Sequence, residues 1–159
     1  MGYAVEEVDI PFANLQAKNP DIKRFSASTI IFCRDPHNPT EPYAFLCQRA
    51  HWDHSLGKAN SWAGSWETPG GSHDHGESIL DTAIRETREE AIKLNPDEHM
   101  DFCWATEAQI RDSLPYDAEK PQQEGLVMLE NKKKTILDAF KQLQDSQLDM
   151  IVRSGEPRE

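Results

Sequence analysis

Two apolar runs in the first third of the chain predict neighbouring β-strands. Residues 26–33 (SASTIIFC) and 43–48 (YAFLCQ) are rich in β-branched and aromatic side chains. The segment between them, residues 34–42, contains proline, aspartate and asparagine, which favour turns. Such a spacing indicates two adjacent antiparallel strands. Residues 1–24 are polar with short apolar stretches, and we expect them to form an arm that leads into the domain.

A helical pattern begins at Glu77. Apolar side chains recur at helical spacing from Ile79 onwards, whereas the acidic side chains lie off that stripe. The pattern continues through Leu94, and Pro96 stops it. We therefore predict one amphipathic helix from Glu77 to Leu94, with an apolar face towards the core and an acidic face away from it.

The second half of the chain alternates between short strands and helices. We expect, in order, a strand at 100–105, a short helix at 106–113, a strand at 126–129 and a long helix at 130–148. Thr106 is placed to cap the short helix, and Ile136 and Phe140 belong to the buried stripe of the long one. These elements indicate the α/β class, with one domain over residues 25–148 and a tail at 149–159.

Composition narrows the function. The hydrophobic content of 37% is sufficient for a single core. The formal net charge of -11 argues against nucleic acid or an anionic membrane as a partner. A phosphate-containing ligand would therefore need cations to screen it. Lys132, Lys133 and Lys134 form the only basic run, and Glu130 just ahead of them favours a solvated helix face over a binding patch.

The cysteines argue against a disulfide framework or a zinc site. Cys33, Cys47 and Cys103 are widely spaced and form no Cys-x-x-Cys pair. Cys47 and Cys103 lie within apolar strand patterns, where a core position is favoured over a nucleophile. Residues 1–14 contain no long apolar run, so neither a signal peptide nor a membrane span is expected there. We expect a cytoplasmic protein.

Three glutamates on the predicted helix are the leading candidates for chemistry. Glu86, Glu89 and Glu90 stand at i, i+3 and i+4, so their carboxylates project from one side of a helix. Each such like-charge pair costs about 0.2 to 0.5 kcal/mol, which a solvated acidic face tolerates. A hard divalent cation would turn the repulsion into attraction, because Mg²⁺ prefers carboxylate oxygens, waters and phosphates.

A longer motif surrounds these glutamates and favours the metal interpretation. Its members, at fixed spacings, are Pro69, Gly70, Gly71, Glu77, Arg85, Glu86, Glu89 and Glu90. The six matches from Gly71 onwards would arise by chance on the order of once in 10⁵ chains of this size. The motif resembles the Nudix box, and the resemblance covers about residues 66–94. It is looser in the upstream strands and in residues 104–107.

The resemblance implies a mixed β-sheet flanked by helices and a metal-dependent hydrolase. Its substrate would be a nucleoside diphosphate linked to another moiety, and its cofactor Mg²⁺ or Mn²⁺. By resemblance, the metal ligands would be Glu86, Glu89, Glu90 and the carbonyl of Gly71. One of these glutamates would also be the base, Arg85 would orient them, and Glu77 would support Arg85. Nothing in the sequence selects one diphosphate substrate or an oligomeric state.

Substrate contacts are expected from Gly70, Gly71 and Trp52. The two glycines allow the backbone to approach the cluster closely. Trp52, between His51 and His54, offers a stacking surface, although a partly buried anchor is favoured. We expect Trp62 and Trp66 to pack beneath the Gly70–Gly71 turn. His73 and His75 are weak candidates for metal ligands, because alternate residues of a polar loop point in different directions.

The chain also departs from the family pattern. Thr87 stands where the family has an apolar residue, and Ile92 stands where a glycine usually ends the helix. In the family, several strands separate the box from the segment that residues 104–111 resemble. Here only residues 95–99 intervene, so a block of strands is expected to be missing between Ala91 and Asn95. The sheet would be incomplete, and strands 26–33 and 43–48 would lack neighbours.

Three hypotheses follow from these features. The first is a Nudix-type hydrolase. The second is a catalytically impaired variant that binds a metal or a partner without turnover. The third is an acidic helical interaction protein whose resemblance is accidental. The sheet content and the turnover of nucleoside diphosphate derivatives separate the first two.

Overall fold

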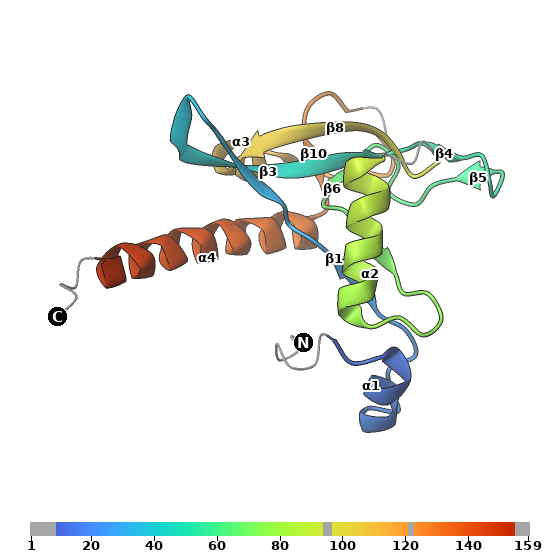
Figure 1. The fold of residues 1–159 in the computed structure, drawn as a ribbon. Helices are drawn as coiled ribbons and strands as arrows, with labels where there is room; N and C mark the ends of the chain where they lie inside the picture. The colour runs from blue at the N-terminus through green and yellow to red at the C-terminus, as the bar shows by residue number, and fades with distance from the viewer. Residues whose placement is uncertain (1–8, 94–96, 121–122, 155–159) are drawn as a thin grey trace.

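A four-stranded antiparallel sheet forms the centre of the fold. The computed structural model describes residues 9–93, 97–120 and 123–154 (Figure 1). The long strand β3 (Asn38–Arg49) pairs with β8 (His99–Thr106) along one edge. Its other edge pairs first with β2 (Phe32–Asp35) and then with β6 (Trp66–Glu67). Strand β3 is therefore flanked on both sides.

Three short strand pairs lie around this sheet. The pair that matters for the site is β1 (Ser26–Ser28) with β7 (Gly70–Ser72), which is antiparallel. Strands β4 (Trp52–Asp53) and β5 (Lys58–Ala59) also pair antiparallel, whereas β9 (Leu114–Pro115) and β10 (Val127–Met128) are parallel.

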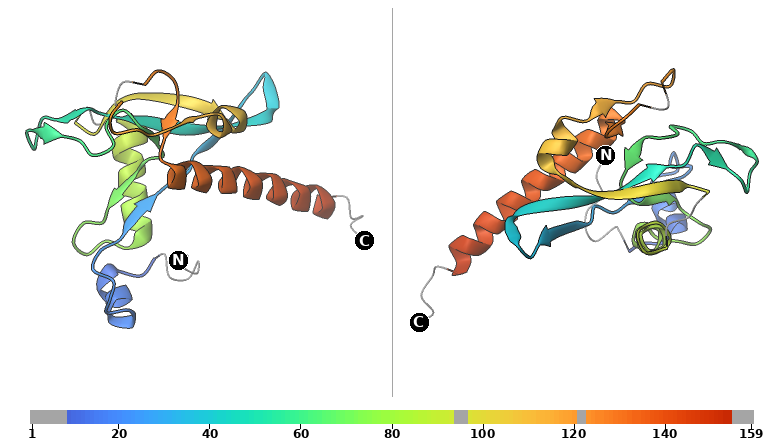
Figure 2. Two further views of the ribbon diagram at one scale, coloured as in Figure 1. Left: turned by 180° about the vertical axis from the view of Figure 1, so that it is seen from behind. Right: turned by 90° about the horizontal axis from the view of Figure 1, so that it is seen from above.

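Helices surround the sheet and complete a mixed α/β fold, as the sequence predicts. They are α1 (Phe12–Lys18), α2 (Ile79–Glu86), the π-helix η2 (Thr87–Ile92), α3 (Glu107–Arg111) and α4 (Glu130–Ser154). Helix α2 stands across one end of the sheet, and α1 lies at the far end of α2 (Figures 1 and 2). Helix α4 begins beside the sheet and extends away from it (Figures 1 and 2).

The core lies between one face of the sheet and α4. Ala44 and Leu46 of β3 and Ala105 of β8 belong to the same buried cluster as Ile136 and Phe140 of α4. The buried stripe predicted for the long helix is thus confirmed at Ile136 and Phe140. Burying each large side chain contributes about 1.5 to 3 kcal/mol, so this layer holds α4 against the sheet.

The helix that carries the glutamates begins two residues later than the sequence indicates. Ser78 is its N-cap, with Asp81 completing a capping box: the Ser78 side chain accepts from the Asp81 N–H, and the Asp81 carboxylate accepts from the Ser78 N–H. Glu77 therefore lies in the preceding turn rather than in the helix. The predicted end of the helix at Leu94 and the stop at Pro96 lie outside the described residues.

The predicted strands do not lack neighbours, so that expectation is wrong. The run 26–33 divides into two strands, β1 and β2, each of which has an antiparallel partner. The run 43–48 lies within β3, the best-paired strand in the described sheet. Within the described residues β8 pairs only with β3, and its Phe102 and Trp104 are exposed.

Membrane insertion finds no support in the helices. Within the part of the chain that the structure describes, none combines the length and apolar character needed to cross a bilayer.

Candidate functional site

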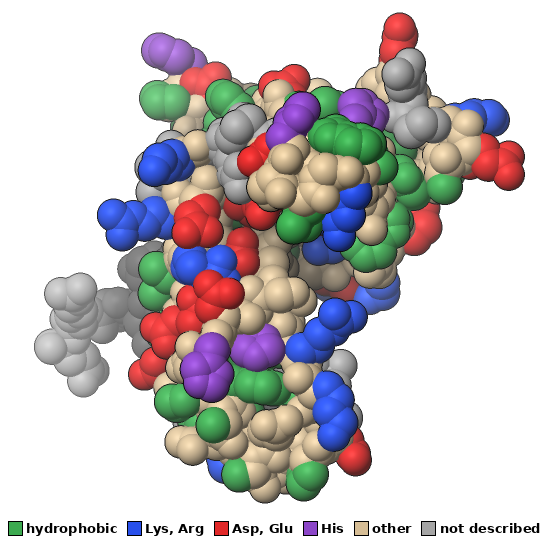
Figure 3. Space-filling model, turned by 90° about the vertical axis from the view of Figure 1, so that its right-hand side faces the viewer, with side chains coloured by type: hydrophobic (Ala, Val, Ile, Leu, Met, Phe, Trp, Pro, Cys, Tyr) green, Lys and Arg blue, Asp and Glu red, His purple; other side chains and the backbone are tan. Residues whose placement is uncertain are grey.

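A polar cleft of about 570 Å³ collects most of the box residues. Its floor and walls come from strands β1 and β7, the α2–η2 helix, and the ends of β3, β6 and α4. The box residues that line it are Gly70, Gly71, Arg85, Glu86 and Glu90. Figure 3 shows acidic side chains gathered in a band on this side of the molecule, with basic ones among them.

Arg85 holds the cluster together. Its Nε donates to Glu77 Oε1 at 2.8 Å and its Nη2 to Glu77 Oε2 at 3.1 Å, a bidentate pair. Its Nη1 donates to Glu86 Oε1 at 2.9 Å, and Nη2 also donates to the carbonyl of Ser72 at 2.9 Å. The bonds from Arg85, followed by the one from the Asp74 N–H, lower the pKa of Glu77 to about 2. One side chain thus ties α2 to the turn before it and to β7.

Glu86 lies directly against Gly71. Only 6% of Glu86 is exposed, and a Cβ placed on Gly71 would come within 2.6 Å of the Glu86 carboxyl carbon. Position 71 must therefore be glycine if Glu86 is to keep this place. Burial raises the pKa of Glu86, and the neighbouring Arg85 opposes that rise.

Glu90 is buried more deeply. It is 3% exposed, and its Oε2 accepts a hydrogen bond from the Gly70 N–H at 2.7 Å. Burial raises the pKa of Glu90 to about 8, and the nearby charges of Glu86, Glu98 and Glu67 act in the same direction. A carboxylate in this position needs a countercharge to ionise at neutral pH.

Glu89 and Trp52 lie outside the cleft lining. The side chain of Glu89 is 55% exposed and its Oε2 is 3.4 Å from Arg85 Nη1. Trp52, on β4, is 47% exposed. Trp62 lines the cleft instead, is exposed, and has a left-handed backbone conformation (φ 57°). Trp66 belongs to the core cluster, so these tryptophans do not pack together beneath the glycine turn.

A buried carboxylate that the sequence did not single out stands beside the cluster. Glu67 pairs with Arg49 and lies 3.5 Å from Lys132 Nζ. Burial favours its neutral form, but His99, Arg49 and Lys132 together lower the pKa of Glu67 to about 2. Glu67 is adjacent to the buried Trp66 and outside the fixed spacing of the box, so no local signal identified it.

The basic run is only partly the solvated face that the sequence favoured. Lys132 lines the cleft, and Lys133 Nζ donates to the carbonyl of Ser113 at 3.0 Å. Lys134 alone follows the expectation, with an exposed partner, Asp138, on the same helix.

Glu98 and His99 also join the site without having been predicted. Glu98 lines the cleft, and His99 is 1% exposed. Among the described residues, only Glu90, Glu98 and His99 place three ligand atoms within 4.8 Å of one another. The three box glutamates do not converge in the same way. A Glu-His pair at a strand start has no helical periodicity, so no pattern in the sequence connects it with Glu90.

The remaining candidates have structural roles. The His73 ring stacks on Phe25, with ring centroids 4.5 Å apart, and also contacts Phe12. Cys47 is fully buried and Cys103 packs against the core, which confirms their predicted positions. Burial raises the pKa of Cys47 to about 12, so its thiol is a poor nucleophile. All three cysteines are free.

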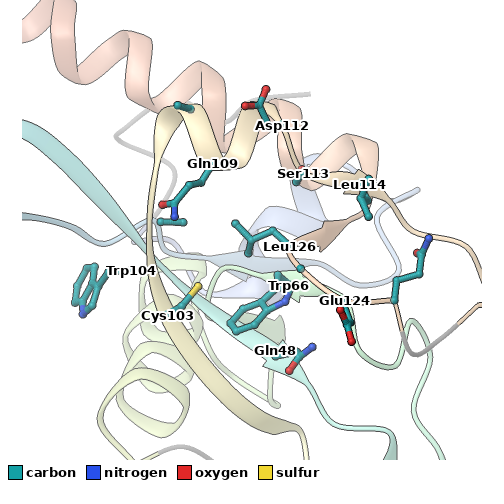
Figure 4. A pocket seen from close by; sticks show the side chains of 14 residues that line it. Gln48, Trp66, Cys103, Trp104, Gln109, Asp112, Ser113, Leu114, Glu124 and Leu126 are labelled. Atoms are coloured by element: carbon teal, nitrogen blue, oxygen red, sulfur yellow. The ribbon is translucent and has the colours of Figure 1, made fainter.

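A second, larger cavity of about 860 Å³ lies on the other side of β6 from the carboxylates. Side chains of β3, β6, β8 and α3 line it, with Trp66, Gln48 and Leu126 among them (Figure 4). None of the motif residues at fixed spacing, from Pro69 to Glu90, lines it. The acidic cleft is therefore the better candidate for phosphate chemistry, despite its smaller volume.

The donor set fits a hard divalent cation. Glu86 and Glu90 offer carboxylate oxygens in the cleft, and the absence of a Cβ at Gly71 lets the Glu86 carboxylate lie against the backbone there. Mg²⁺ and Mn²⁺ prefer such oxygen ligands together with water.

Comparisons with known proteins identify the family and support the fold. The family model described as NUDIX domain matches residues 24–148. Among solved structures, a MutT/nudix family protein from Enterococcus faecalis aligns with a TM-score of 0.53 at 14% identity, over 90% of this chain and 70% of that one. Its similarity supports the fold. No curated protein matches the chain.

Two weaker structural matches have TM-scores below 0.5. One is a Nudix hydrolase from M. smegmatis (0.39, 18% identity, 55% of this chain and 73% of that one). The other is a mutT/nudix family protein from Listeria innocua (0.43, 16% identity, 82% of this chain and 97% of that one).

Proposed function

The chain belongs to the Nudix family, and from that premise we propose that it hydrolyses a phosphoanhydride bond in a nucleoside diphosphate linked to another moiety. The match spans most of the chain, so the third hypothesis, an accidental resemblance, is wrong. The observation that carries the proposal is the Arg85 network: Arg85, bound by Glu77, joins Glu86 to the Ser72 carbonyl in one cleft.

The residues that would hold the cation are Glu86, Glu89, Glu90 and the Gly71 carbonyl. When bound, a divalent cation neutralises charge on the diphosphate and makes a water molecule easier to deprotonate. Glu89 lies outside the cleft lining, so it would reach the cation from the exposed side, by a change of its side-chain rotamer.

The chain's own residues supply the rest of the reaction. The carboxylate of Glu86 or of Glu90 takes the proton from the attacking water, because both line the cleft and burial raises the pKa of both. Arg85 fixes the rotamer of Glu86 through its Nη1 bond to Oε1. The oxygen of the water becomes bonded to phosphorus, and the leaving phosphate departs with the electrons of the broken phosphoanhydride.

Two cations of the chain assist in binding a polyanion. Arg49 and Lys132 both line the cleft, where they meet Glu67. The molecule is strongly acidic, so these two side chains provide local positive charge that the net charge of -11 does not reveal.

A matched set of variants tests the proposal. Glu86→Gln removes charge but almost no volume, so the fold should be kept while turnover falls by about 10²-fold or more. Turnover of a panel of nucleoside diphosphate derivatives is measured with Mg²⁺ and in excess chelator. The control is Glu124→Gln, the same change of carboxylate to carboxamide at an exposed residue on the loop before β10. Unchanged turnover in Glu86→Gln, or full activity in chelator, would sink the mechanism.

A second candidate function is a metal- or partner-binding module with little turnover. The observation that favours it is the single pairing of β8 within the described sheet, together with exposed Phe102 and Trp104. Metal binding that depends on Glu90, in a purified chain that turns over none of the panel, would support this candidate over the first.

A further inference from the structure

His99 is a buried histidine without a hydrogen-bond partner. It begins β8, is 1% exposed, and neither ring nitrogen makes a hydrogen bond within the described residues. Buried polar atoms are nearly always paired, because an unpaired one loses its hydration without replacement. The Arg85 network does not include this ring, so its position needs another explanation.

Carboxylates face both nitrogens of the ring. Nδ1 lies 3.7 Å from Glu90 Oε1, and Nε2 lies 3.7 Å from Glu67 Oε1. Both distances exceed those of hydrogen bonds. Glu98 also lies near this pair: one ligand atom from each of Glu90, Glu98 and His99 lies within 4.8 Å of the other two. Around one ion about 2.1 Å from each ligand, ligand atoms lie about 3 to 4 Å apart, so a small contraction closes this cluster.

The two sides of the ring differ in charge environment. Glu67 is paired with Arg49 and Lys132, which keep its carboxylate charged, and so it can accept the proton of Nε2. A carboxylate that accepts from one ring nitrogen fixes the tautomer and leaves the other lone pair for a metal. Glu90, by contrast, has no cationic partner among the described residues.

We propose that Glu90, Glu98 and Nδ1 of His99 form a divalent-cation site of mixed nitrogen and oxygen donors, which shares Glu90 with the box. Imidazole suits first-row transition-metal ions better than Mg²⁺, so the occupant is an ion of that class. This inference rests on the proposed function in that both use Glu90. It adds ligands from β8 and the residue before it, outside the box.

Pulsed electron paramagnetic resonance of Mn²⁺ bound to the full chain tests the assignment. We expect coupling of the electron spin to a histidine nitrogen, and the coupling should change to that of ¹⁵N when histidine alone is labelled with ¹⁵N. The measurement on wild type requires no variant to fold. His99→Asn should abolish the coupling, and Glu98→Gln should weaken Mn²⁺ affinity about tenfold. His75→Asn, an exposed loop histidine, should change neither.

The outcomes separate this inference from the proposed function. If Mn²⁺ binds without nitrogen coupling while turnover depends on Glu86, the function stands and the mixed site is wrong. If the purified protein shows nitrogen coupling but no turnover, the mixed metal site is supported and the proposed hydrolase function is wrong. Coupling that persists in folded His99→Asn would also overturn the assignment.

Discussion

Individual residues in the cleft divide into those the sequence could identify and those it could not. Arg85, Glu86 and Glu90 have fixed spacing on one helix, so a local motif was enough to place them together. Glu67 and His99 come from β6 and β8, and they meet Glu90 only because both strands flank the ends of β3. Contacts between distant segments leave no periodic signal, and so these residues were missed.

Glu77 should influence stability in acid. Its folded pKa of about 2 lies below the usual 4.5, so its contribution is full above pH 4.5 and is lost as pH falls towards 2. Glu77→Gln should remove that part of the acid slope and destabilise the protein at pH 7 by about 1 kcal/mol. Urea unfolding from pH 2 to 7 measures it, with Glu124→Gln as a control. An acid slope identical in Glu77→Gln and wild type would show that the ion pair with Arg85 is not formed.

Gly71 should tolerate no side chain. Gly71→Ala places a Cβ against the Glu86 carboxylate, so Glu86 must move and Mg²⁺ affinity should fall about tenfold or more. Calorimetric titration measures the affinity. Ser72→Ala, at the exposed end of the same strand, is the matched control because only the Ser72 carbonyl contacts Arg85. Equal affinity in both variants would remove Gly71 from the site.

At the level of elements, the helix that carries the glutamates departs from a regular α-helix where the sequence departs from the family. The Thr87 hydroxyl donates to the Ala83 carbonyl at 2.7 Å, and the π-helix η2 begins at Thr87. Such back-bonding competes with the regular i→i−4 pattern, and π-turns are frequent at functional sites. The sequence identified Thr87 as unusual, but periodicity alone could not predict a π-helix.

The N-cap of α2, Ser78, should contribute to the stability of the protein. Ser78→Ala removes the hydroxyl that accepts from the Asp81 N–H, which should cost about 1 kcal/mol. For a domain of this size that lowers Tm by about 2 to 4 °C in calorimetry. Ser61→Ala, on an exposed loop, should leave Tm unchanged. If the two variants melt alike, the capping box does not stabilise α2.

For the molecule as a whole, the fold class and most elements followed from hydrophobic patterning, but the completeness of the sheet did not. One edge of β3 pairs with β2 and β6 and the other with β8, and both β6 and β8 are remote from β3 in sequence. A count of strand-like runs missed the two-residue β6 because it is too short to show alternation. The strands predicted to lack neighbours are paired, whereas β8 pairs with β3 alone within the described residues.

An open strand beside exposed aromatic side chains favours self-association. We expect the sedimentation coefficient of wild type to rise with protein concentration, and Phe102→Lys to reduce that rise. Phe102 is 54% exposed, and the charge would repel a second strand. Leu56→Lys, at a 64% exposed apolar position on the turn between β4 and β5, is the control. If wild type stays monomeric at every concentration, the edge of β8 does not promote self-association.

Transfer of labelled oxygen from water to phosphate tests directly whether the protein hydrolyses a phosphoanhydride bond. The purified chain is incubated with Mg²⁺ and a panel of nucleoside diphosphate derivatives in ¹⁸O-labelled water, and the phosphate products are weighed by mass spectrometry. Hydrolysis at this site should place one labelled oxygen per turnover on a product phosphate, at a rate that depends on Mg²⁺ and falls by about 10²-fold in Glu86→Gln. Label that appears at the same rate in Glu86→Gln, or no labelled product from any substrate, would contradict it.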